Sequence, residues 1–305
     1  MIKIRNLTIS FNRQVPVVDN LNLDIRPGET TVIVGESGSG KSVTIAAILR
    51  LLPKEALVQG SITLYGRELL SLTDDEMNLF RGKALGYVPQ GGGSSMHPLL
   101  TVGAQIAEPI TVHRKMSKRN SFQMAAEWLD KMGLQPSDKI ARAYPHTLSG
   151  GMKQRALIAM GAAGGAQILL ADEPTKGLDY KRIAQVEELF EELSDRTILC
   201  VTHDLHFARN IADNICVMYG GEAVELADVD SFFEDPKHPY SKMLLASLPE
   251  NGMQCPDNFT PPVSGRAGCL FYHRCPNRNA KCLSDAQMHS SGNHLVRCHL
   301  YDIAN

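Results

Sequence analysis

The sequence predicts an α/β fold, with a mixed β-sheet core, an antiparallel β part, a helical part and a small cysteine-containing C-terminal extension. Three observations carry this prediction. Apolar runs of strand length alternate with helical patterns between residues 149 and 212, which is the spacing of β–α–β units on a parallel sheet. A glycine-rich segment at residues 35–42 joins a buried strand pattern to a helix. Residues 1–25 alternate apolar and polar positions between turn signals, which is typical of antiparallel strands.

Length and charge limit the classes of protein. The chain has 305 residues, enough for one large α/β domain with an appendage or for two modest domains. Its formal net charge of −2 gives no bulk attraction to nucleic acid or anionic lipid, and we expect no nucleic-acid partner. The N-terminus lacks the apolar core of a signal peptide, and the longest uncharged run, residues 156–171, is shorter than the ~20 apolar residues that span a bilayer. Any membrane role is therefore expected to be peripheral.

The first 90 residues are predicted to contain several strands, one helix after the glycine-rich segment and one short capped helix. The tetrapeptide Thr73-Asp74-Asp75-Glu76 is a capping box, in which each terminal side chain bonds the backbone N–H of the other residue. The predicted strands are residues 2–11, 15–18, 21–25, 31–34, 61–65 and 85–88, and the predicted helix is residues 42–52.

A helical insertion is predicted for residues 102–133. Phe122, Ala125 and Leu129 lie on one broad apolar face of this segment, and Gly133 is a helix stop signal. Such a run of helix within a chain of strands predicts a helical part beside the sheet, at about residues 91–163.

The second half of the chain returns to alternating elements before its composition changes. We expect helices at 149–160, 180–193 and 204–212 and strands at 168–171 and 197–201. Residues 248–265 are rich in Pro, Asn and Gly and lack periodicity, which indicates a linker. The predicted domains are therefore residues 1–247, the linker 248–265 and an extension at 266–305.

The glycine-rich segment carries the strongest chemical signal. It reads Gly35-Glu36-Ser37-Gly38-Ser39-Gly40-Lys41-Ser42 and matches the phosphate-binding pattern G-x-x-x-x-G-K-[ST] between a strand and a helix. Glycines let successive backbone N–H groups turn toward a polyphosphate, and the helix N-terminus adds its positive dipole end. Lys41 is predicted to reach the β- and γ-phosphates, and Ser42 to ligate Mg²⁺. The alternative is a glycine-rich turn without a ligand, which rarely carries Lys-Ser at the helix start.

Further polar groups follow at strand and helix ends. The strand pattern 168–171 leads into Asp172 and Glu173, which predicts a Mg²⁺ ligand followed by a carboxylate that deprotonates an attacking water. The segment Ser149-Gly150-Gly151-Met152 opens a helix and predicts a second phosphate-binding helix terminus. Three further polar residues come in order along the chain: Gln90, Asp179 and His203.

With these motifs in this order, residues 1–235 resemble the ATP-binding subunits of ABC transporters. The resemblance implies that two such subunits meet head to tail, each closing the ATP site of the other with its Ser149-Gly150-Gly151-Met152 signature. It implies Mg²⁺ ligation by Ser42, Gln90 and Asp172, and catalysis by Glu173 with His203 on the γ-phosphate. It further implies that Phe11 stacks on adenine, that Val43 joins the octapeptide in ATP binding, and that Asp179 bridges the dimer. A lone Phe, Gln or His would otherwise be read as a core or surface residue.

Two segments point to one branch of this family. His238-Pro239-Tyr240-Ser241-Lys242 and Thr101-Val102-Gly103-Ala104-Gln105-Ile106 resemble segments of oligopeptide, dipeptide and nickel importers. Such importers imply a homo- or heterodimer of ATPases, two integral-membrane permease subunits and an extracytoplasmic substrate-binding protein, with the ATPase on the cytoplasmic face of the membrane. The segment Gln90-Gly91-Gly92-Gly93-Ser94-Ser95 departs from the branch pattern, because glycines stand where an acidic residue is usual.

The extension carries Cys269, Cys275, Cys282 and Cys298, and a tail of this kind is also found in that branch. Four thiols in a short, weakly apolar segment suggest a tetrahedral metal site, for which a 4Fe–4S cluster is favoured over Zn²⁺. The alternative is reduced thiols in a packed tail. Because all four cysteines follow the linker and are remote in sequence from every ATP motif, we expect the tail to take no part in hydrolysis and the loss of a cysteine to leave ATP affinity little changed. Of the other cysteines, Cys200 and Cys216 are expected in the core and Cys255 in the linker.

Other functions remain as alternatives at this point. A soluble ABC ATPase of DNA repair or translation would carry a long coiled coil or a second cassette, which the sequence lacks. A regulatory module that binds nucleotide without hydrolysis is opposed by Lys41, Glu173 and His203. An exporter ATPase would usually be fused to a membrane domain. The sequence therefore favours an importer ATPase for peptides or for nickel and metal chelates.

Overall fold

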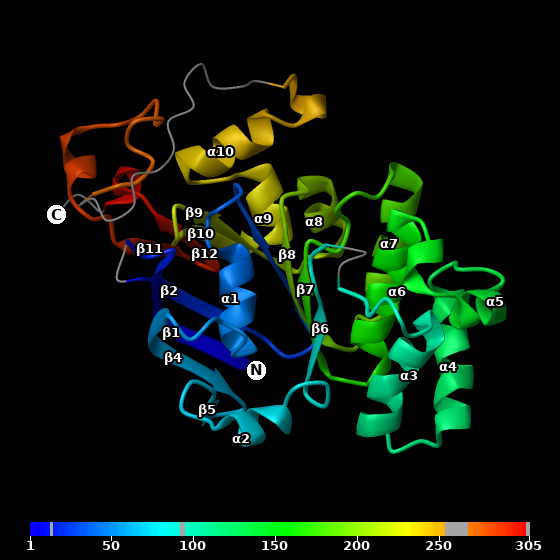
Figure 1. The fold of residues 1–305 in the computed structure, drawn as a ribbon. Helices are drawn as coiled ribbons and strands as arrows, with labels where there is room; N and C mark the ends of the chain where they lie inside the picture. Colours follow the sequence, from blue (N-terminus) through cyan, green and yellow to red (C-terminus); the bar gives the residue numbers. More distant parts are fainter. Residues whose placement is uncertain (13–14, 92–94, 254–267, 303–305) are drawn as a thin grey trace. The chain divides into compact units, whose positions relative to one another are not determined.

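The computed structural model describes residues 1–12, 15–91, 95–253 and 268–302. Within it the chain forms two compact units (Figure 1). Unit 1 consists of residues 1–25, 31–70 and 212–305, and unit 2 of residues 26–30 and 71–211. The last 94 or so residues therefore return to the unit that holds the N-terminus and the glycine-rich segment.

An antiparallel sheet in unit 1 confirms the prediction for the N-terminal part. Its strand order is β2-β1-β4-β5. The predicted strand 21–25 lies in β2, whereas only Val18 of the predicted run 15–18 belongs to a strand, because β2 begins at that residue. Within β2 the register shifts between the pairs Leu7–Leu21 and Ile9–Val18, at Asn20, whose φ is 48°. The bounds are β1 Ile2–Phe11, β2 Val18–Ile25, β4 Ala56–Leu64 and β5 Arg67–Glu68.

A second set of strands in unit 1 carries the glycine-rich segment and the C-terminal tail. Its order is β11-β12-β10-β9-β3, in which β3 and β9 are parallel and the other neighbours antiparallel. The hairpin β11–β12 of the tail, which was not predicted, pairs Leu295 and Val296 with Leu226 and Glu225 of β10. The bounds are β3 Thr30–Val34, β9 Asn214–Tyr219, β10 Glu222–Asp228, β11 Met288–Ser291 and β12 His294–Arg297.

Short helices complete unit 1. Helix α1 ends earlier than its predicted residue 52, because Arg50 has a φ of 52° and leaves the helical conformation. The helices are α1 Lys41–Ile48, α9 Val229–Glu234 and α10 Pro239–Ala246, with 3₁₀ turns η2 Pro249–Asn251, η3 Ala280–Leu283 and η4 His299–Tyr301.

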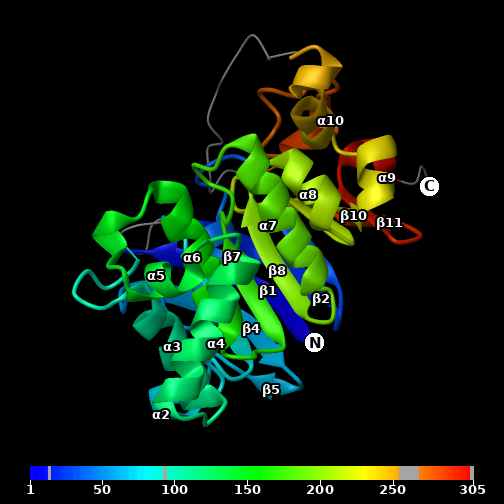
Figure 2. The same cartoon turned by 90° about the vertical axis from the view of Figure 1, so that its right-hand side faces the viewer.

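Unit 2 contains parallel strands in the order β8-β7-β6, which confirms the predicted β–α–β units. Every residue of β7 and β8 is buried. Figure 2 shows α7 and α8 side by side, and Phe190 and Phe207 pack edge to face between them. The predicted capping box opens α2. The bounds are α2 Asp74–Asn78, β6 Leu85–Val88, β7 Ile168–Asp172, α7 Tyr180–Glu192, β8 Thr197–Thr202 and α8 Leu205–Ile211.

The helical part of unit 2 is built from more helices than the single predicted run. The pattern at residues 102–133 is broken at Lys115, whose φ is 54°, and Ser117 caps the next helix through the N–H of Asn120. Gly133 ends that helix with a φ of 62°, as predicted. The elements are α3 Val102–His113, α4 Lys118–Lys131, α5 Ser137–Arg142, η1 Pro145–Thr147 and α6 Gly150–Ala163.

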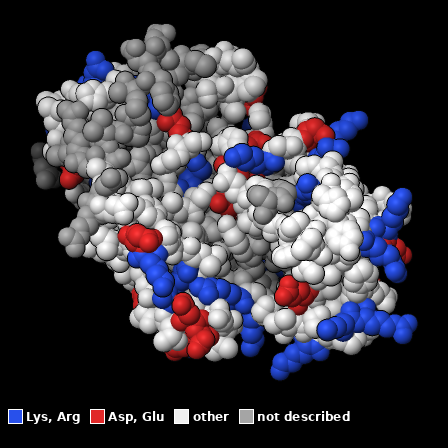
Figure 3. Space-filling view, in the orientation of Figure 1, with Lys and Arg blue, Asp and Glu red and all other residues white. Residues whose placement is uncertain are grey.

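None of the helices in the described parts of the chain has the length and apolar character needed to cross a bilayer. Lys and Arg side chains are interspersed with Asp and Glu on the face shown in Figure 3, in keeping with the net charge of −2.

The predicted domain bounds 1–247, 248–265 and 266–305 stay a prediction. Most of the linker, with Cys255, falls in residues 254–267, outside the described residues. An extension that is a separate module is not confirmed, since β12 pairs with β10 and the tail groups with unit 1.

Candidate functional site

The phosphate-binding pattern folds into a loop that only glycine can form at two positions. Gly35 has a φ of 149°, and a Cβ there would lie 2.1 Å from the carbonyl oxygen of Met218. Gly40 has a φ of 95°, and its Cβ would lie 2.6 Å from the carbonyl oxygen of Val17. The backbone of the loop is thus packed against β9 and the start of β2, which fixes its shape before any ligand binds.

Two side chains of this loop have polar groups suited to a phosphate. The Lys41 ammonium donates to the carbonyl oxygens of Gly35 and Glu36, both at 2.8 Å, and the residue is buried. The Ser39 hydroxyl is buried and makes no hydrogen bond within the described residues. Buried polar groups normally have a partner. The loop therefore fits a polyphosphate, whose oxygens would accept from Ser39 and replace carbonyls around Lys41. Ser42 and Val43 lie half-buried in the first turn of α1.

Glu36, in the same loop, is held by Tyr240 and Arg274, for which the sequence predicted no role at this site. Its backbone N–H donates to the Tyr240 hydroxyl at 3.0 Å. Its carboxylate accepts two bonds from Arg274, at 2.9 Å from Nη2 and 3.1 Å from Nη1. The Arg274 side chain is 3% exposed and also donates to the Tyr219 hydroxyl at 3.3 Å. Burial lowers the pKa of Arg274, but the bonds to Glu36 and Tyr219 leave this pKa above its ordinary value.

The predicted catalytic residues of unit 2 meet at the ends of β7 and β8. Asp172 ends β7 and is buried. Glu173 follows with a φ of 50°, and its N–H donates to the carbonyl of Val201 at 2.8 Å. Its carboxylate lies 2.7 Å from Nδ1 of His203, and this carboxylate is 8% exposed while the His203 side chain is 61% exposed. The structure thus brings together the predicted base and the predicted γ-phosphate residue.

The signature segment is presented at the start of α6. The Ser149 hydroxyl caps this helix by accepting from the N–H of Met152 at 3.4 Å. Ser149 and Gly150 are exposed, and a Cβ on Gly150 would meet no atom within 4 Å. Gly151 is buried, and its Cβ would lie 3.1 Å from Nη1 of Arg182. Ser149 and Gly150 can therefore contact a ligand that is bound by another chain, while Gly151 packs against Arg182.

The remaining predicted site residues lie at element ends. Asp179 caps α7 by accepting from the N–H of Arg182 and pairs with the guanidinium of the same residue at 3.0 Å. Gln90 is exposed after β6, and Gly91 follows it with a φ of 98°. Gly92, Gly93 and Ser94 lie outside the described residues. Phe11 ends β1 and is half-buried. Stacking of Phe11 on adenine and the role of Gln90 stay predictions.

A buried amide organises the loop between β6 and α3. The Gln105 side chain accepts from the N–H of His97 at 2.8 Å and donates to the carbonyls of His97 and Leu100, both at 3.0 Å. Leu99 is 77% exposed at the tip of this loop, whereas Met96 is buried. A fixed loop with an exposed apolar tip is a suitable contact for another protein.

The four tail cysteines line one pocket in unit 1, which has Phe271 and His238 in its other walls. Burial raises the pKa of Cys269 to about 11 and also raises the pKa values of Cys275 and Cys298. These thiols are therefore protonated at neutral pH. In the described part of the chain no group of three or more His, Cys, Asp or Glu is arranged to hold a metal ion. The predicted iron–sulfur or zinc centre is thus not supported by this arrangement.

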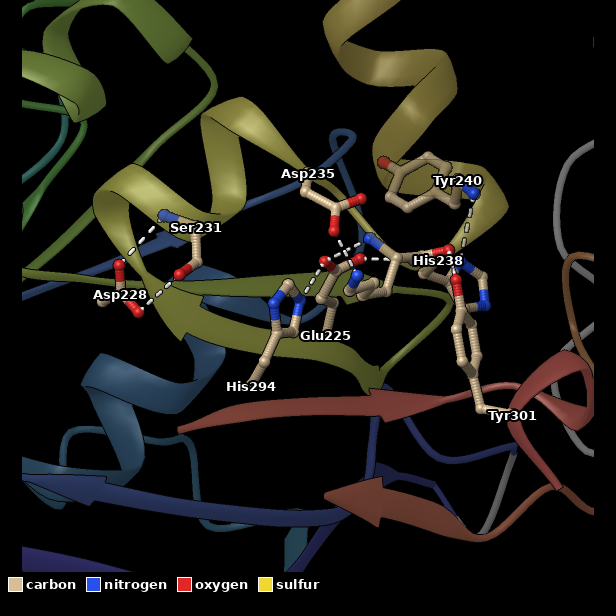
Figure 4. A network of polar contacts seen from close by, with 9 residues as sticks. Glu225, Asp228, Ser231, Asp235, His238, Tyr240, His294 and Tyr301 are labelled. Carbon is tan, nitrogen blue, oxygen red and sulfur yellow. Dashed lines mark hydrogen bonds and ion pairs between the residues drawn. The ribbon is translucent and has the colours of Figure 1, made fainter. Parts of the chain in front are cut away.

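A buried carboxylate, that of Glu225, joins the tail to the rest of unit 1 (Figure 4). Glu225 of β10 is fully buried and accepts from Nε2 of His294 at 2.6 Å. It also accepts from the backbone N–H groups of Lys237 and His238, at 2.7 and 2.6 Å. The Tyr301 hydroxyl donates to the carbonyl of Lys237 at 3.0 Å. Buried carboxylates are stable when several donors satisfy them, so this network fixes both the tail and the turn before α10.

One residue of the tail contacts the phosphate loop, although the two are far apart in the sequence. Arg274 of the tail is bonded to Glu36 of the phosphate loop, across 238 positions of sequence. Distance along the chain was a poor guide because the hairpin β11–β12 folds back onto β10. No local pattern pairs Arg274 with Glu36. Tyr240, however, stands in a segment that the sequence had already marked as typical of importers.

Comparisons with known proteins agree with these features. Residues 18–176 match the family model for ABC transporters, and residues 224–282 match that for the C-terminal region of oligopeptide/dipeptide transporters. The oligopeptide transport ATP-binding protein AppD of Bacillus subtilis (strain 168) is 38% identical over 99% of this chain and 97% of its own length. The oligopeptide transport ATP-binding protein OppD of Escherichia coli (strain K12) is 37% identical over 93% of this chain and 88% of its own.

A solved structure is similar as well. It is a dimeric post-hydrolysis state of the ATP-binding cassette MJ0796 bound to ADP and Pi, with a TM-score of 0.68 and 31% identity over 75% of this chain and 99% of that one.

Proposed function

The chain belongs to the ABC transporter family, and we propose that it is the ATP-hydrolysing subunit that powers uptake of oligopeptides or dipeptides through a separate membrane permease. The observation that carries this proposal is the set of ATP motifs. It includes a phosphate loop that requires glycine at two positions and the contact between Glu173 and His203. The alternatives of an uncoupled ATPase and an exporter are not favoured, because the relatives named above are peptide transport proteins. For the same reason the nickel alternative gains no support.

Each residue has a distinct part in the proposed hydrolysis. Glu173 takes a proton from the attacking water, and His203 orients this carboxylate and contacts the γ-phosphate. Lys41 leaves its loop carbonyls for phosphate oxygens. Mg²⁺ would be held by Ser42, Gln90 and Asp172 and would supply positive charge to the phosphates of ATP.

Two copies, or this chain with a related one, form the active dimer in this proposal. The support is that Ser149 and Gly150 are exposed at the N-terminus of α6, where they can meet ATP held by a partner, and that Asp179 caps the start of α7. Ser149→Arg is expected to leave ATP binding by the single chain unchanged and to abolish ATP-dependent dimerisation. Dimerisation of the variant at the ATP concentration that suffices for wild type would contradict this model.

The proposed membrane partners are two permease subunits, which receive substrate from an extracytoplasmic binding protein and hold this chain peripherally at the cytoplasmic face. The loop that Gln105 fixes is the proposed contact, since Leu99 exposes its apolar side chain there. A cross-linker on Leu99→Cys should capture a permease subunit that wild type does not capture. The buried Met96 is unsuitable for the same experiment.

A metal centre in the tail is retained as a proposal on the chemistry of its donors. Four thiols line one pocket, and a 4Fe–4S cluster or Zn²⁺ would be held by Cys269, Cys275, Cys282 and Cys298 after their protons are displaced. Protein purified without oxygen should contain stoichiometric iron, with absorbance near 400 nm, or zinc without colour. Absence of both metals would leave four reduced thiols.

The experiment that tests the main proposal is peptide uptake by proteoliposomes that contain the assembled transporter. We expect uptake that requires ATP inside the vesicle and that is lost with Lys41→Ala, because the loop then lacks its only charged phosphate ligand. ATP hydrolysis that continues unchanged in Lys41→Ala would contradict the assignment of the site.

A further inference from the structure

Glu36 joins the phosphate loop to two other segments of unit 1. Its carbonyl accepts from the Lys41 ammonium at 2.8 Å and from the N–H of Ser39 at 3.2 Å. Its N–H and its carboxylate are held by Tyr240 and Arg274. The residue therefore connects the side chain that binds phosphate with α10 on one side and with the tail on the other.

The geometry at Arg274 leaves little freedom to either partner. The guanidinium forms a two-bond fork with the Glu36 carboxylate, which is 26% exposed. It also lies over the rings of Tyr219 and Phe271, 5.6 Å from each ring centre. A planar guanidinium that is bidentate and stacked is held in both position and orientation.

The residues around Arg274 are fixed in their turn. The Phe271 ring packs at 5.3 Å from the Tyr219 ring and 5.5 Å from the Tyr240 ring. Tyr240 lies in the first turn of α10, which His238 caps by accepting from the N–H of Tyr240 at 3.0 Å. Burial lowers the pKa of His238 to about 3, so this imidazole stays neutral and can act as the acceptor. The aromatic cluster thus sets the tail against the phosphate loop.

We infer that Arg274 and Tyr240 are positioning residues for ATP binding, through which the cysteine-bearing tail sets the affinity of the phosphate loop. The inference rests on ATP binding at this loop and goes beyond it. Arg274 neutralises Glu36, whose carboxylate would otherwise repel the phosphates of an incoming nucleotide, and holds the peptide that carries acceptors for Lys41. Tyr240 fixes the N–H at the same position.

Removal of the guanidinium tests this role. Arg274→Met keeps the length and apolar contacts of the side chain but leaves the Glu36 carboxylate without its charged partner. We expect the Kd for ATP, measured with a fluorescent ATP analogue on the full chain, to rise about tenfold. In the assembled transporter, KM for ATP should rise by a similar factor while kcat changes by less than about twofold. Arg274→Lys keeps the charge and should recover part of the affinity.

A matched control is available in the same tail. Arg278 is exposed, and the bond described for its guanidinium goes to the carbonyl of His273, within the tail. Arg278→Met removes the same charge from the chain but should leave the Kd unchanged. An equal loss of affinity in both variants would mean that net charge, and not the contact with Glu36, is responsible.

A double substitution tests whether Arg274 affects ATP binding through Glu36. In a Glu36→Gln background the repelling carboxylate is gone, so Arg274→Met should weaken ATP binding by much less than in wild type. Thermal unfolding of each variant separates affinity from folding. If Arg274→Met lowers Tm but binds ATP as wild type does, the inference is wrong, whereas failure of wild type to bind ATP would instead overturn the proposed function.

Discussion

Glu36 and Glu173 are both carboxylates that follow a buried strand, and each has one charged or chargeable partner. The partner of Glu36 is Arg274, a buried guanidinium that is always protonated and that makes two bonds. The partner of Glu173 is His203, a single ring nitrogen on a side chain that is mostly exposed. One carboxylate is paired with a buried, permanent charge through two bonds, while the other has a single contact, at 2.7 Å, with an exposed imidazole.

This difference matches what each carboxylate has to do. A residue that shapes a binding loop needs to stay in one place, and a bidentate pair provides that. A general base must release its partner and accept a proton, so a permanently charged neighbour would reduce its basicity. The kind of partner, more than the burial of the carboxylate, therefore separates the positioning role from the catalytic one.

The largest effect is expected for the catalytic carboxylate. Glu173→Gln keeps the size of the side chain and a hydrogen bond to His203 but removes the base, so turnover should fall by roughly 10²-fold or more with ATP binding retained. Phosphate release by the assembled transporter measures it. Glu191→Gln, which changes an exposed carboxylate of α7, serves as the control and should leave turnover unchanged. Near-normal turnover of Glu173→Gln would show that Glu173 is not the catalytic base and so does not differ from Glu36 in this respect.

A second variant gives the catalytic carboxylate a partner like that of Glu36. His203→Arg should neutralise Glu173 permanently, and we expect turnover to fall by about tenfold to a hundredfold. His206→Arg, an equal change at an exposed position of α8, is the matched control. Full turnover in His203→Arg would show that the release of this partner is not needed.

The smallest effect concerns a third carboxylate, Glu222, which pairs with Arg297 of β12 at 3.3 Å. Burial raises the pKa of Glu222 to about 7, although Arg297 lowers it, so the folded protein favours the protonated form. This group stabilises the fold fully below an unfolded pKa of about 4.5, and that contribution is lost as the pH rises through about 7.

Glu222→Gln should therefore flatten the pH dependence of Tm between about 4.5 and 7, an effect of about 1–2 kcal/mol in the free energy of unfolding after allowance for solvent screening. Differential scanning of both proteins across this range measures it. An identical pH profile for the variant would show that Glu222 does not lose its proton over this range.

The sequence alone determined the features that depend on residues close together in the chain. Glycines at Gly35 and Gly40 were predicted to form the phosphate loop because their backbone conformation admits no side chain, and the structure agrees. The capping residues Thr73 and Ser149 marked helix starts because a cap is a bond to a residue three positions away. The family followed from the order of such local motifs.

The sequence was less reliable in predicting where elements begin and end. The run 15–18 was predicted as a strand, but β2 begins only at Val18, because a run of four residues with a Pro is a weak strand signal. The left-handed residue Lys115 split one helical pattern into two helices. That backbone conformation belongs to a single residue, whose side chain carries little warning of it.

Only the tertiary structure decided which residues the tail contacts. Arg274 meets Glu36, and His294 meets Glu225, because the hairpin β11–β12 pairs with β10. Such contacts arise from how strands far apart in the chain are placed side by side, and long-range pairing leaves no periodic signal at the paired positions. The motifs that bind ATP are local because a loop of backbone N–H groups does the binding, whereas the partners that hold the loop in place come from across the fold.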